Sequence, residues 1–554
     1  MKKFSIQRTK NFRLNWIHII ILIIGFGPGI YARSFEESPF GFHPASIYLP
    51  GYNQNGFFDA ENIGVRWHRP PVYAFWFMVQ PDLGDSTLNF SFYDALYGSV
   101  PSSINILVNI APQGHIDEGY CLPGSYLPVD SAKYVRFVKA TVERYDGDGI
   151  YDMPGLVNPI RYWQVGNEPS ATSPSGFAAI QRITYQAIKE VCPGCWVLIG
   201  GAFQPINPFG FVVDTEEYLE WFSIFYEPIL EELDGKGVDI FDFHWYGQAT
   251  GDYRKCGVIF DSLKSILTRH NFGEIPIWIT EMGSYSGNPT EPQFGYQSEA
   301  QQAGDYLKRF IYPFSIGVEK IFPAFGLMEG FIHDDGYFDH TGLIYDGKGS
   351  NDLGLGVKKL GYFTYKLMTE KLAGYDWNRA QTLINGLDNI YAYKFTQVAT
   401  GKPIYVVWWD WFDDSTYIEG DTIMVRLEIG DMDSIRITEA VPDAESGAEL
   451  NENDYPDFFI TRTKPVIDGK VTFTLRENPV FIEEFGAPLR GDANSDGKVT
   501  ISDVVFVVNY LFKGGPAPNP LSIGDVNCDS SVNVSDVVYL VTYLFKGGPA
   551  PCSL

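Results

Sequence analysis

Basic residues are scarce in this 554-residue chain. It has 41 lysines and arginines against 68 aspartates and glutamates, which gives a formal net charge of −27 at pH 7. Nucleic acids and anionic membrane surfaces are bound by basic surface, so this imbalance excludes both as expected partners. It suits a protein that binds a neutral polymer or a cation such as Ca²⁺.

Long hydrophobic runs are also lacking, with one exception near the N-terminus. Five basic residues precede an apolar run at 16–26, and Gly27-Pro28-Gly29 ends that run. The run is shorter than the roughly 20 residues that span a bilayer, and this order of segments is typical of a secretory signal. We expect a signal peptide over residues 1–32, no membrane span in the mature chain and a secreted, extracellular protein. An uncleaved anchor is disfavoured because Gly and Pro end the run early.

Cysteines are few, but their number, six, is even. In an exported chain this favours disulfides over zinc or redox sites. Cys528 and Cys552 bracket the last segment and are expected to pair. The Cys-Pro-Gly-Cys motif at 192–195 favours a local structural disulfide over a redox pair. Cys121 and Cys256 remain for a third bridge.

A glycine-rich phosphate loop is absent after the first predicted strand, which disfavours an open nucleotide-binding sheet. Strand patterns instead alternate with helical patterns such as 131–145 and 176–191. Eight strands are predicted, at residues 41–45, 64–68, 104–110, 160–165, 196–200, 238–244, 275–280 and 320–325. Eight such units predict the α/β class and a (β/α)8 TIM barrel over residues 40–375.

Past Tyr375 the pattern changes to short strands separated by turns. We predict an all-β sandwich over residues 376–485, followed by a linker at 486–490 and a small α-helical module at 491–554. The sandwich strands are predicted at 390–395, 404–409, 424–429, 470–475 and 479–483.

The C-terminal module contains an internal repeat, in which residues 492–518 recur at 525–551. Each copy has oxygen-bearing residues at loop positions 1, 3, 5 and 12, the spacing that Ca²⁺ loops use, and an apolar helical pattern follows. Gly497 occupies the sharp turn at position 6 of the first loop, and Ser530 replaces it in the second. The predicted metal residues are Asp492, Asn494, Asp496, Lys498 and Asp503, and Asp525, Asn527, Asp529, Ser531 and Asp536.

With these loops and helices the module resembles a type I dockerin. The resemblance implies two structural Ca²⁺ sites, a cohesin-type protein partner and attachment to a cell-surface or multi-enzyme scaffold. The chain departs from the family at positions 10 and 11, where Ile501-Ser502 and Val534-Ser535 replace the polar pairs often used in partner recognition. The identity of the partner is therefore left open.

Two carboxylate motifs follow strands of the predicted barrel. Glu168 lies in a Gly-Asn-Glu-Pro motif after the fourth strand, and Glu281 lies in a Thr-Glu-Met-Gly motif at the end of the seventh. Barrel active sites gather at the C-terminal ends of the strands, and a pair of glutamates is the minimal machinery for cleaving a glycosidic bond. Two structural carboxylates are the alternative.

The chain resembles the retaining glycoside hydrolases of clan A at these motifs, and families 39, 51 and 5 most closely. The resemblance covers residues 40–485 and implies that Glu168 is the acid/base and Glu281 the nucleophile. It further implies that Asn167 contacts the sugar 2-hydroxyl. The two carboxyl groups of a retaining enzyme are expected about 5 to 5.5 Å apart, and no cofactor takes part in catalysis.

Further residues match the supporting positions of that clan. His244 and Tyr246 form its strand-six His-x-Tyr pattern, whose tyrosine supports the nucleophile, and Arg69 matches the strand-two arginine that keeps the nucleophile ionised. Strand eight departs from the pattern because it lacks the tryptophan usual under the reacting sugar. Phe325 or Phe331 is expected in its place.

The function predicted from the sequence is a secreted retaining glycoside hydrolase that acts on O-glycosidic bonds of a polysaccharide or oligosaccharide. The alternative is a non-catalytic carbohydrate-binding or adhesive protein with a Ca²⁺-dependent docking tail. Retention of Arg69, Asn167 and Tyr246 around both glutamates favours the enzyme. Which glycan is cleaved, and whether internally or terminally, is left open.

Overall fold

The computed structural model describes most of the chain beyond its N-terminal segment. The described residues are 38–47, 52, 55–112, 119–122, 125–169, 173–204, 206–207, 210–211, 214–430, 432–486, 489–494, 498–518 and 520–552. The signal peptide expected over residues 1–32 lies outside them, as do residues 487–488 of the expected linker. Among the described helices, none combines the length and apolar character needed to cross a membrane.

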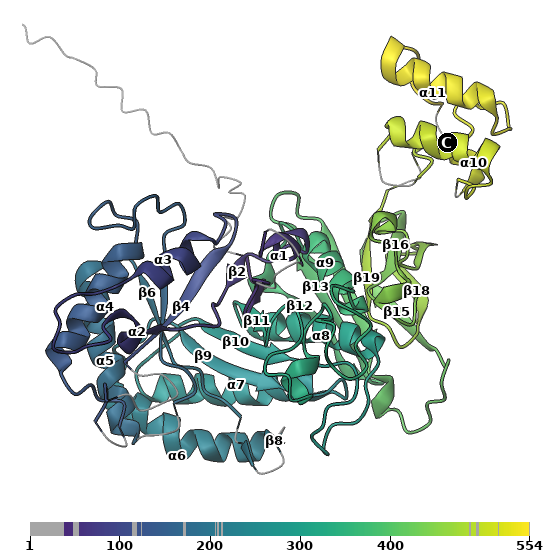
Figure 1. The fold of residues 1–554 in the computed structure, drawn as a ribbon. Coiled ribbons are helices and arrows are strands. Elements are labelled where there is room, and N and C mark those ends of the chain that lie inside the picture. Colours follow the sequence, from purple (N-terminus) through teal and green to yellow (C-terminus); the bar gives the residue numbers. More distant parts are fainter. Residues whose placement is uncertain are drawn as a thin grey trace, which may run out of the picture.

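Eight parallel strands close a barrel (Figure 1). They are β1 (Gly41–Phe42), β2 (Trp67–His68), β4 (Asn105–Ala111), β5 (Tyr162–Val165), β6 (Trp196–Ile199), β9 (Phe241–Tyr246), β10 (Ile277–Gly283) and β11 (Ile321–Pro323). They pair in the order β1-β2-β4-β5-β6 and β9-β10-β11. Parallel bridges from Leu198 to Ile240 and from Phe40 to Ile321 join the two sheets. The predicted (β/α)8 TIM barrel is confirmed.

Eight helices follow the barrel strands. They are α1 (Phe58–Asn62), α3 (Ser91–Gly98), α4 (Ser131–Tyr145), α5 (Pro174–Val191), α6 (Thr215–Leu233), α7 (Asp252–Arg269), α8 (Glu299–Ile316) and α9 (Leu360–Lys371). The bounds predicted for α4 are correct. Helix α5 starts two residues earlier than predicted because Ser173 caps it and Pro174 occupies its first turn. Four short elements were not predicted: β3 (Ala74–Phe75), α2 (Trp76–Val79), β7 (Ile206–Asn207) and β8 (Gly210–Phe211).

The barrel interior is layered. Its lower layer is an apolar cluster of Trp67, Leu107, Leu198, Ile240, Trp278 and Phe322. Side chains two residues apart on a strand point to the same face, so the next inward positions lie nearer the C-terminal ends of the strands. These positions are polar and buried: Arg69, Asn109, Gln164, Asp242 and Thr280. The polar layer forms the floor of the candidate active site.

The sandwich is antiparallel. A six-stranded sheet runs in the order β12-β13-β14-β19-β16-β17, and β15 pairs with β18. The strands are β12 (Gln381–Leu387), β13 (Ile390–Thr396), β14 (Pro403–Trp409), β15 (Ile423–Glu428), β16 (Ser434–Glu439), β17 (Thr461–Pro465), β18 (Lys470–Leu475) and β19 (Val480–Phe485). The five predicted strands are present, and β12, β16 and β17 were not predicted.

A buried ion network fixes the sandwich to the barrel. Asp410 follows β14 and is fully buried; it accepts hydrogen bonds from Lys308 Nζ of α8 at 2.8 Å and from the Tyr253 hydroxyl of α7 at 2.7 Å. The indole of Trp408 donates to the same hydroxyl at 2.8 Å. The barrel and sandwich therefore share a rigid, specific interface.

The C-terminal module packs two helices against each other, α10 (Ile501–Lys513) and α11 (Val534–Lys546). Val504, Val526 and Leu540 form its small core. The module lies above the sandwich in the view of Figure 1. A core this small supplies little stability, so the module depends on additional constraints.

Two of the three expected disulfides are present. Cys192 pairs with Cys195, and Cys528 pairs with Cys552. The expected bridge between Cys121 and Cys256 is wrong, because both are buried thiols. Cys121 lies in the loop after β4, where its thiol contacts the Tyr126 carbonyl, whereas Cys256 lies in α7.

Candidate active site and calcium loops

Two different backbone features place the two glutamates at the mouth of the barrel. Glu168 lies in the turn after β5 and adopts a φ of 40°, which is unusual for a residue with a side chain. Glu281 lies within β10, where the strand register shifts between Trp278 and Glu281. Such a bulge re-aims a side chain, so Thr280 and Glu281 both contact inward-facing groups. One carboxylate oxygen of Glu168 lies within 4.8 Å of one of Glu281.

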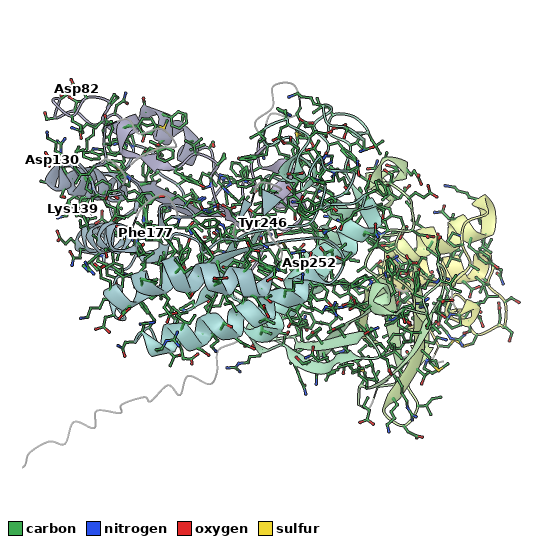
Figure 2. The ribbon with its side chains drawn as sticks, turned by 90° about the horizontal axis from the view of Figure 1, so that it is seen from below. Asp82, Asp130, Lys139, Phe177, Tyr246 and Asp252 are labelled. Carbon is green, nitrogen blue, oxygen red and sulfur yellow. A yellow bond between two sulfur atoms is a disulfide. The ribbon has the colours of Figure 1, made fainter. Side chains whose placement is uncertain are left out.

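Glu281 is held as an ionised carboxylate. Arg69 Nη1 donates to its Oε1 at 2.6 Å, and the Tyr246 hydroxyl donates to its Oε2 at 2.5 Å. Burial alone would raise the pKa of Glu281, but the charges of His244 and Arg69 outweigh it and lower the pKa to about 2. The position of Tyr246 in the body of the barrel is labelled in Figure 2.

Arg69 connects several of the predicted residues. It is fully buried, and besides Glu281 it donates through Nη2 to Asn167 Oδ1 at 2.6 Å and through Nε to Gln164 Oε1 at 3.0 Å. A buried guanidinium needs this degree of pairing to offset its desolvation. Arg69 therefore holds Asn167, the chain neighbour of Glu168, in a fixed position relative to Glu281.

His244 is a buried cation between carboxylates. Its Nδ1 lies 2.7 Å from Glu168 and 3.6 Å from Glu281, and its Nε2 lies 3.3 Å from Asp242. Burial alone would lower the pKa of His244, but the charges of Glu281 and Asp242 raise it to about 10. His244 therefore acts here as an ion-pair and hydrogen-bond partner of the surrounding carboxylates.

Glu168 has the higher pKa of the two glutamates. Burial raises its pKa, and the charge of Glu281 adds to this effect, whereas the hydrogen bond from His244 opposes it. The Glu168 side chain is 28% exposed and that of Glu281 is 2% exposed. The site thus pairs a partly exposed glutamate whose pKa is raised with a buried glutamate whose pKa is lowered, the direction of difference that acid/base and nucleophile roles require.

The structure brings together all six predicted residues of the site: Glu168, Glu281, Arg69, Asn167, His244 and Tyr246. Sequence reasoning missed Gln164 and Asp242 beneath them. Gln164 Nε2 donates to Asp242 Oδ2 at 2.6 Å, and Thr280 donates to the same oxygen at 2.6 Å. A signal was available, because Asp242 precedes His244 and Tyr246 at every second position of a strand otherwise rich in aromatics.

Two stacked phenylalanines follow β11, the eighth strand of the barrel. The rings of Phe325 and Phe331 are 4.1 Å apart with an angle of 17° between their planes, and Phe325 lies 5.0 Å from the ring of His43. His43 Nε2 is 3.7 Å from Glu281, so this stack borders the site. The expectation that Phe325 or Phe331 takes the place of the tryptophan stays a prediction.

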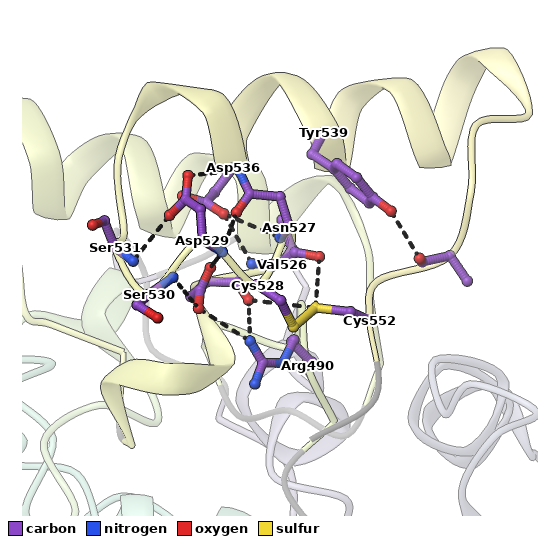
Figure 3. The surroundings of a disulfide bond; sticks show 12 residues. Arg490, Val526, Asn527, Cys528, Asp529, Ser530, Ser531, Asp536, Tyr539 and Cys552 are labelled. Carbon is purple, nitrogen blue, oxygen red and sulfur yellow. Dashed lines mark hydrogen bonds and ion pairs between the residues drawn. A yellow bond between two sulfur atoms is a disulfide. The ribbon is translucent and has the colours of Figure 1, made fainter.

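The second loop of the C-terminal module gathers oxygen ligands. Carboxylate oxygens of Asp525, Asp529 and Asp536 converge within 4.8 Å of one another, and Asn527 and Ser531 belong to the same loop (Figure 3). A convergent set of hard oxygens fits Ca²⁺. Ser530 at position 6 adopts a φ of 72° without being glycine, and the Cys528–Cys552 disulfide ties this loop to the C-terminal segment.

The first loop is described in part. Asp492 and Asp503 are buried, and Asn494 N donates to Asp503 Oδ1 at 3.1 Å. Lys498 follows at position 7, and Asp496 lies outside the described residues. Another acidic group, formed by Asp146, Asp148 and Asp152, converges within 4.8 Å in the loop after α4.

Family comparisons match both functional parts of the chain. Residues 201–313 match the glycosyl hydrolase catalytic core, and residues 490–545 match the dockerin type I domain. The chain is therefore a glycosidase that carries a C-terminal type I dockerin, a calcium-binding module. No curated protein matches its sequence.

Solved structures show the same fold at low sequence identity. A family 39 glycoside hydrolase from the gut symbiont Bacteroides cellulosilyticus is 17% identical with a TM-score of 0.56, and the match covers 81% of this chain and 82% of that one. The thermostable family 51 α-L-arabinofuranosidase from Thermotoga petrophila is 12% identical with a TM-score of 0.53, covering 80% of this chain and 95% of that one. These likenesses support the barrel and sandwich architecture.

Proposed function

We propose that this protein is a secreted retaining glycoside hydrolase that cleaves O-glycosidic bonds of a polysaccharide or oligosaccharide by double displacement. The observation that carries the proposal is the approach of the two carboxylates, with an oxygen of Glu168 within 4.8 Å of an oxygen of Glu281. Retaining enzymes place these groups about 5 to 5.5 Å apart, whereas inverting enzymes need about 6.5 to 9.5 Å to admit water.

In the first step Glu281 is the nucleophile. One of its oxygens attacks the anomeric carbon, the bond from that carbon to the leaving oxygen breaks, and Glu168 transfers its proton to the leaving oxygen. The low pKa of Glu281 and the raised pKa of Glu168 supply these protonation states.

In the second step Glu168 is the base. It takes a proton from water as the water oxygen attacks the anomeric carbon, and the bond to Glu281 breaks. Formation of the glycosyl ester removes the charge of Glu281, so the pKa of Glu168 falls and its carboxylate form is favoured at this stage.

The surrounding residues position the reacting groups. Arg69 and Tyr246 hold both oxygens of Glu281 and stabilise its charge when it leaves the sugar. Asn167 accepts from Arg69 through its carbonyl oxygen, so its amide NH2 is oriented to donate to the sugar 2-hydroxyl. His244 donates a hydrogen bond to Glu168 and so keeps the carboxyl group of Glu168 within reach of the leaving oxygen.

We further propose that the dockerin tethers the secreted enzyme through a cohesin-type partner. Two Ca²⁺ ions would be held by Asp492, Asn494, Asp496, Lys498 and Asp503, and by Asp525, Asn527, Asp529, Ser531 and Asp536, with position 7 contributing its backbone carbonyl. Exposed apolar side chains on α10 and α11, such as Val505 and Val538, offer a docking face to that partner.

Covalent trapping tests the catalytic proposal. A panel of activated 2-fluoro glycosides should label the wild-type protein on Glu281, as located by mass spectrometry of its peptides. The Glu281→Gln variant should remain unlabelled. Label on another residue, or inverted stereochemistry of the product sugar, would contradict the retaining assignment.

A further inference from the structure

A second pocket lies where the sandwich meets the barrel, apart from the two glutamates. It encloses about 300 Å³ and is lined by side chains of both domains. Its barrel wall is the first half of α8 together with Ala249, and its sandwich wall comprises Trp411, Phe412, Tyr417, Glu419, Glu477 and Asn478. We call it the junction pocket. Pockets of this size at domain junctions are common binding sites.

The sandwich wall is rigidly held. Trp411 and Phe412 directly follow Asp410, which is bound to Lys308 and Tyr253, and Arg254 Nη2 pairs with Asp413 at 2.6 Å. The loop that carries the aromatic rings is thus anchored on both sides of Trp411. A site that is already ordered before binding loses less entropy when it binds.

The aromatic side chains supply flat apolar faces. Trp411 and Tyr417 are half-buried, with ring centroids 4.7 Å apart and 40° between their planes. The negative face of an aromatic ring attracts the slightly positive C–H groups of a sugar ring. Phe412 instead faces Lys308 at 5.1 Å, so Trp411 and Tyr417 are the platform.

Polar groups border this platform without being used by the fold. Within the described part of the chain, neither Glu419 nor Asn478 makes a side-chain hydrogen bond or ion pair, while Glu477 accepts from the Tyr417 hydroxyl. Lys308 is neutralised by Asp410. The uncompensated charges of the pocket are therefore negative, which disfavours anionic glycans and leaves hydroxyl groups as the fitting donors.

The junction pocket is close to the catalytic residues along the chain. Ala249 lies three residues after Tyr246, the residue that contacts Glu281, so their Cα atoms are at most about 11 Å apart. We propose that the junction pocket binds an uncharged sugar unit of the same glycan chain whose scissile bond lies between Glu168 and Glu281. This inference rests on the proposed function and assigns it a neutral, polymeric substrate.

Trp411→Ala, Asn478→Ala and the control Trp196→Ala test the inference. Trp196 is 44% exposed at the start of β6, at the end of the barrel opposite the active site. Each variant is assayed on a neutral polysaccharide that the wild type hydrolyses and on a short aryl glycoside that fills the catalytic site alone. Loss of one aromatic contact should lower kcat/KM on the polymer by about three- to tenfold, mainly through KM, and leave the short substrate unchanged.

The result that overturns the inference is an unchanged ratio of the two kcat/KM values in Trp411→Ala and Asn478→Ala. An equal loss on both substrates also overturns it, because the residues would then act on folding or on the catalytic site. Depletion of the Glu281→Gln protein by insoluble polysaccharide, with and without Trp411→Ala, measures binding without hydrolysis. If the wild type binds the polysaccharide through Trp411 but hydrolyses no glycan, the proposed function is refuted, whereas the junction pocket is still a sugar-binding site.

Discussion

Nδ1 of His244 lies 2.7 Å from Oε1 of Glu168, so a buried imidazole whose pKa is raised contacts the carboxyl group that we propose as the acid/base. The contact opposes the burial that raises the pKa of Glu168. The pKa of Glu168 is therefore a balance in which burial and the charge of Glu281 raise it while His244 and Arg69 lower it.

Replacing His244 should move the pH profile. Its charge lowers the pKa values of both Glu168 and Glu281, so His244→Gln should shift both limbs of the kcat/KM profile to higher pH. The acid limb, which follows Glu281 from its pKa of about 2, should become easier to observe. His270→Gln is the control, since His270 pairs with Glu227 at the end of α7. Unshifted limbs would show that His244 is not charged in the free enzyme.

The two glutamates should respond differently to replacement. Glu168→Gln removes the general acid, so kcat on substrates with poor leaving groups should fall about 10² to 10⁴-fold, whereas glycosyl fluorides should still form the covalent intermediate. Glu281→Gln should abolish turnover of both kinds of substrate. Steady-state and burst kinetics distinguish the cases. The roles are exchanged if Glu281→Gln is the variant that still accumulates the intermediate.

Calcium removal should act on the C-terminal module alone. The carboxylates of Asp525, Asp529 and Asp536 converge within 4.8 Å and repel one another without a cation, so chelation should abolish the dockerin unfolding transition in calorimetry of the full chain. The barrel transition and the activity on a short substrate should be unchanged. Asp536→Asn should weaken Ca²⁺ binding in a calorimetric titration. A dockerin transition that persists in excess chelator would contradict a folding role for Ca²⁺.

The Cys528–Cys552 disulfide should stabilise the second loop. It closes a segment with a sequence separation of 24 residues, for which chain entropy predicts about 3.5 kcal/mol of dockerin stability. Cys528→Ser with Cys552→Ser should lower the dockerin Tm and the Ca²⁺ affinity of one site. The matched control, Cys192→Ser with Cys195→Ser, should leave both values unchanged, because that bridge lies at the end of α5.

The buried carboxylate at the domain junction should be essential to stability. Asp410→Asn leaves Lys308 buried without its counter-charge, which should lower the free energy of unfolding by about 3 to 5 kcal/mol. Asp413→Asn removes a more exposed partner of Arg254 and should cost about 1 kcal/mol or less. Denaturant unfolding of the two variants provides the comparison. Equal losses would show that burial of Asp410 is not what matters.

The sequence predicts the barrel well because its strands are buried on both sides and its helices have one apolar face. All eight strands, and both glutamates at their ends, were found from local patterns. The support beneath the site was not found in this way, since Gln164 and Asp242 are 78 residues apart, lie on strands β5 and β9 that do not pair with each other, and meet only inside the closed barrel. The bulge that directs Glu281 inward also leaves no local signal.

The sandwich strands are harder to predict from the sequence because the outer ones lack a hydrophobic pattern. Strand β12 is largely exposed and contains Gly386, and β17 is an exposed edge strand that ends in Pro465. Neither alternates in the way that predicts a half-buried strand. Strand β16 does alternate, with Ile435 and Ile437 buried, and it is as long as the predicted strands β15 and β18, so its pattern was sufficient and was overlooked.

The network around Asp410 also determines how a mechanical load passes from the sandwich to the barrel. A pull on the C-terminal module enters the sandwich through residues 486–490, and the buried contacts of Asp410 with Lys308 and Tyr253 pass it to α8 and α7 of the barrel. An enzyme anchored by its tail would therefore carry the load through the sandwich into the outer helices of the barrel, so that barrel and sandwich turn together over a solid surface without opening the catalytic floor.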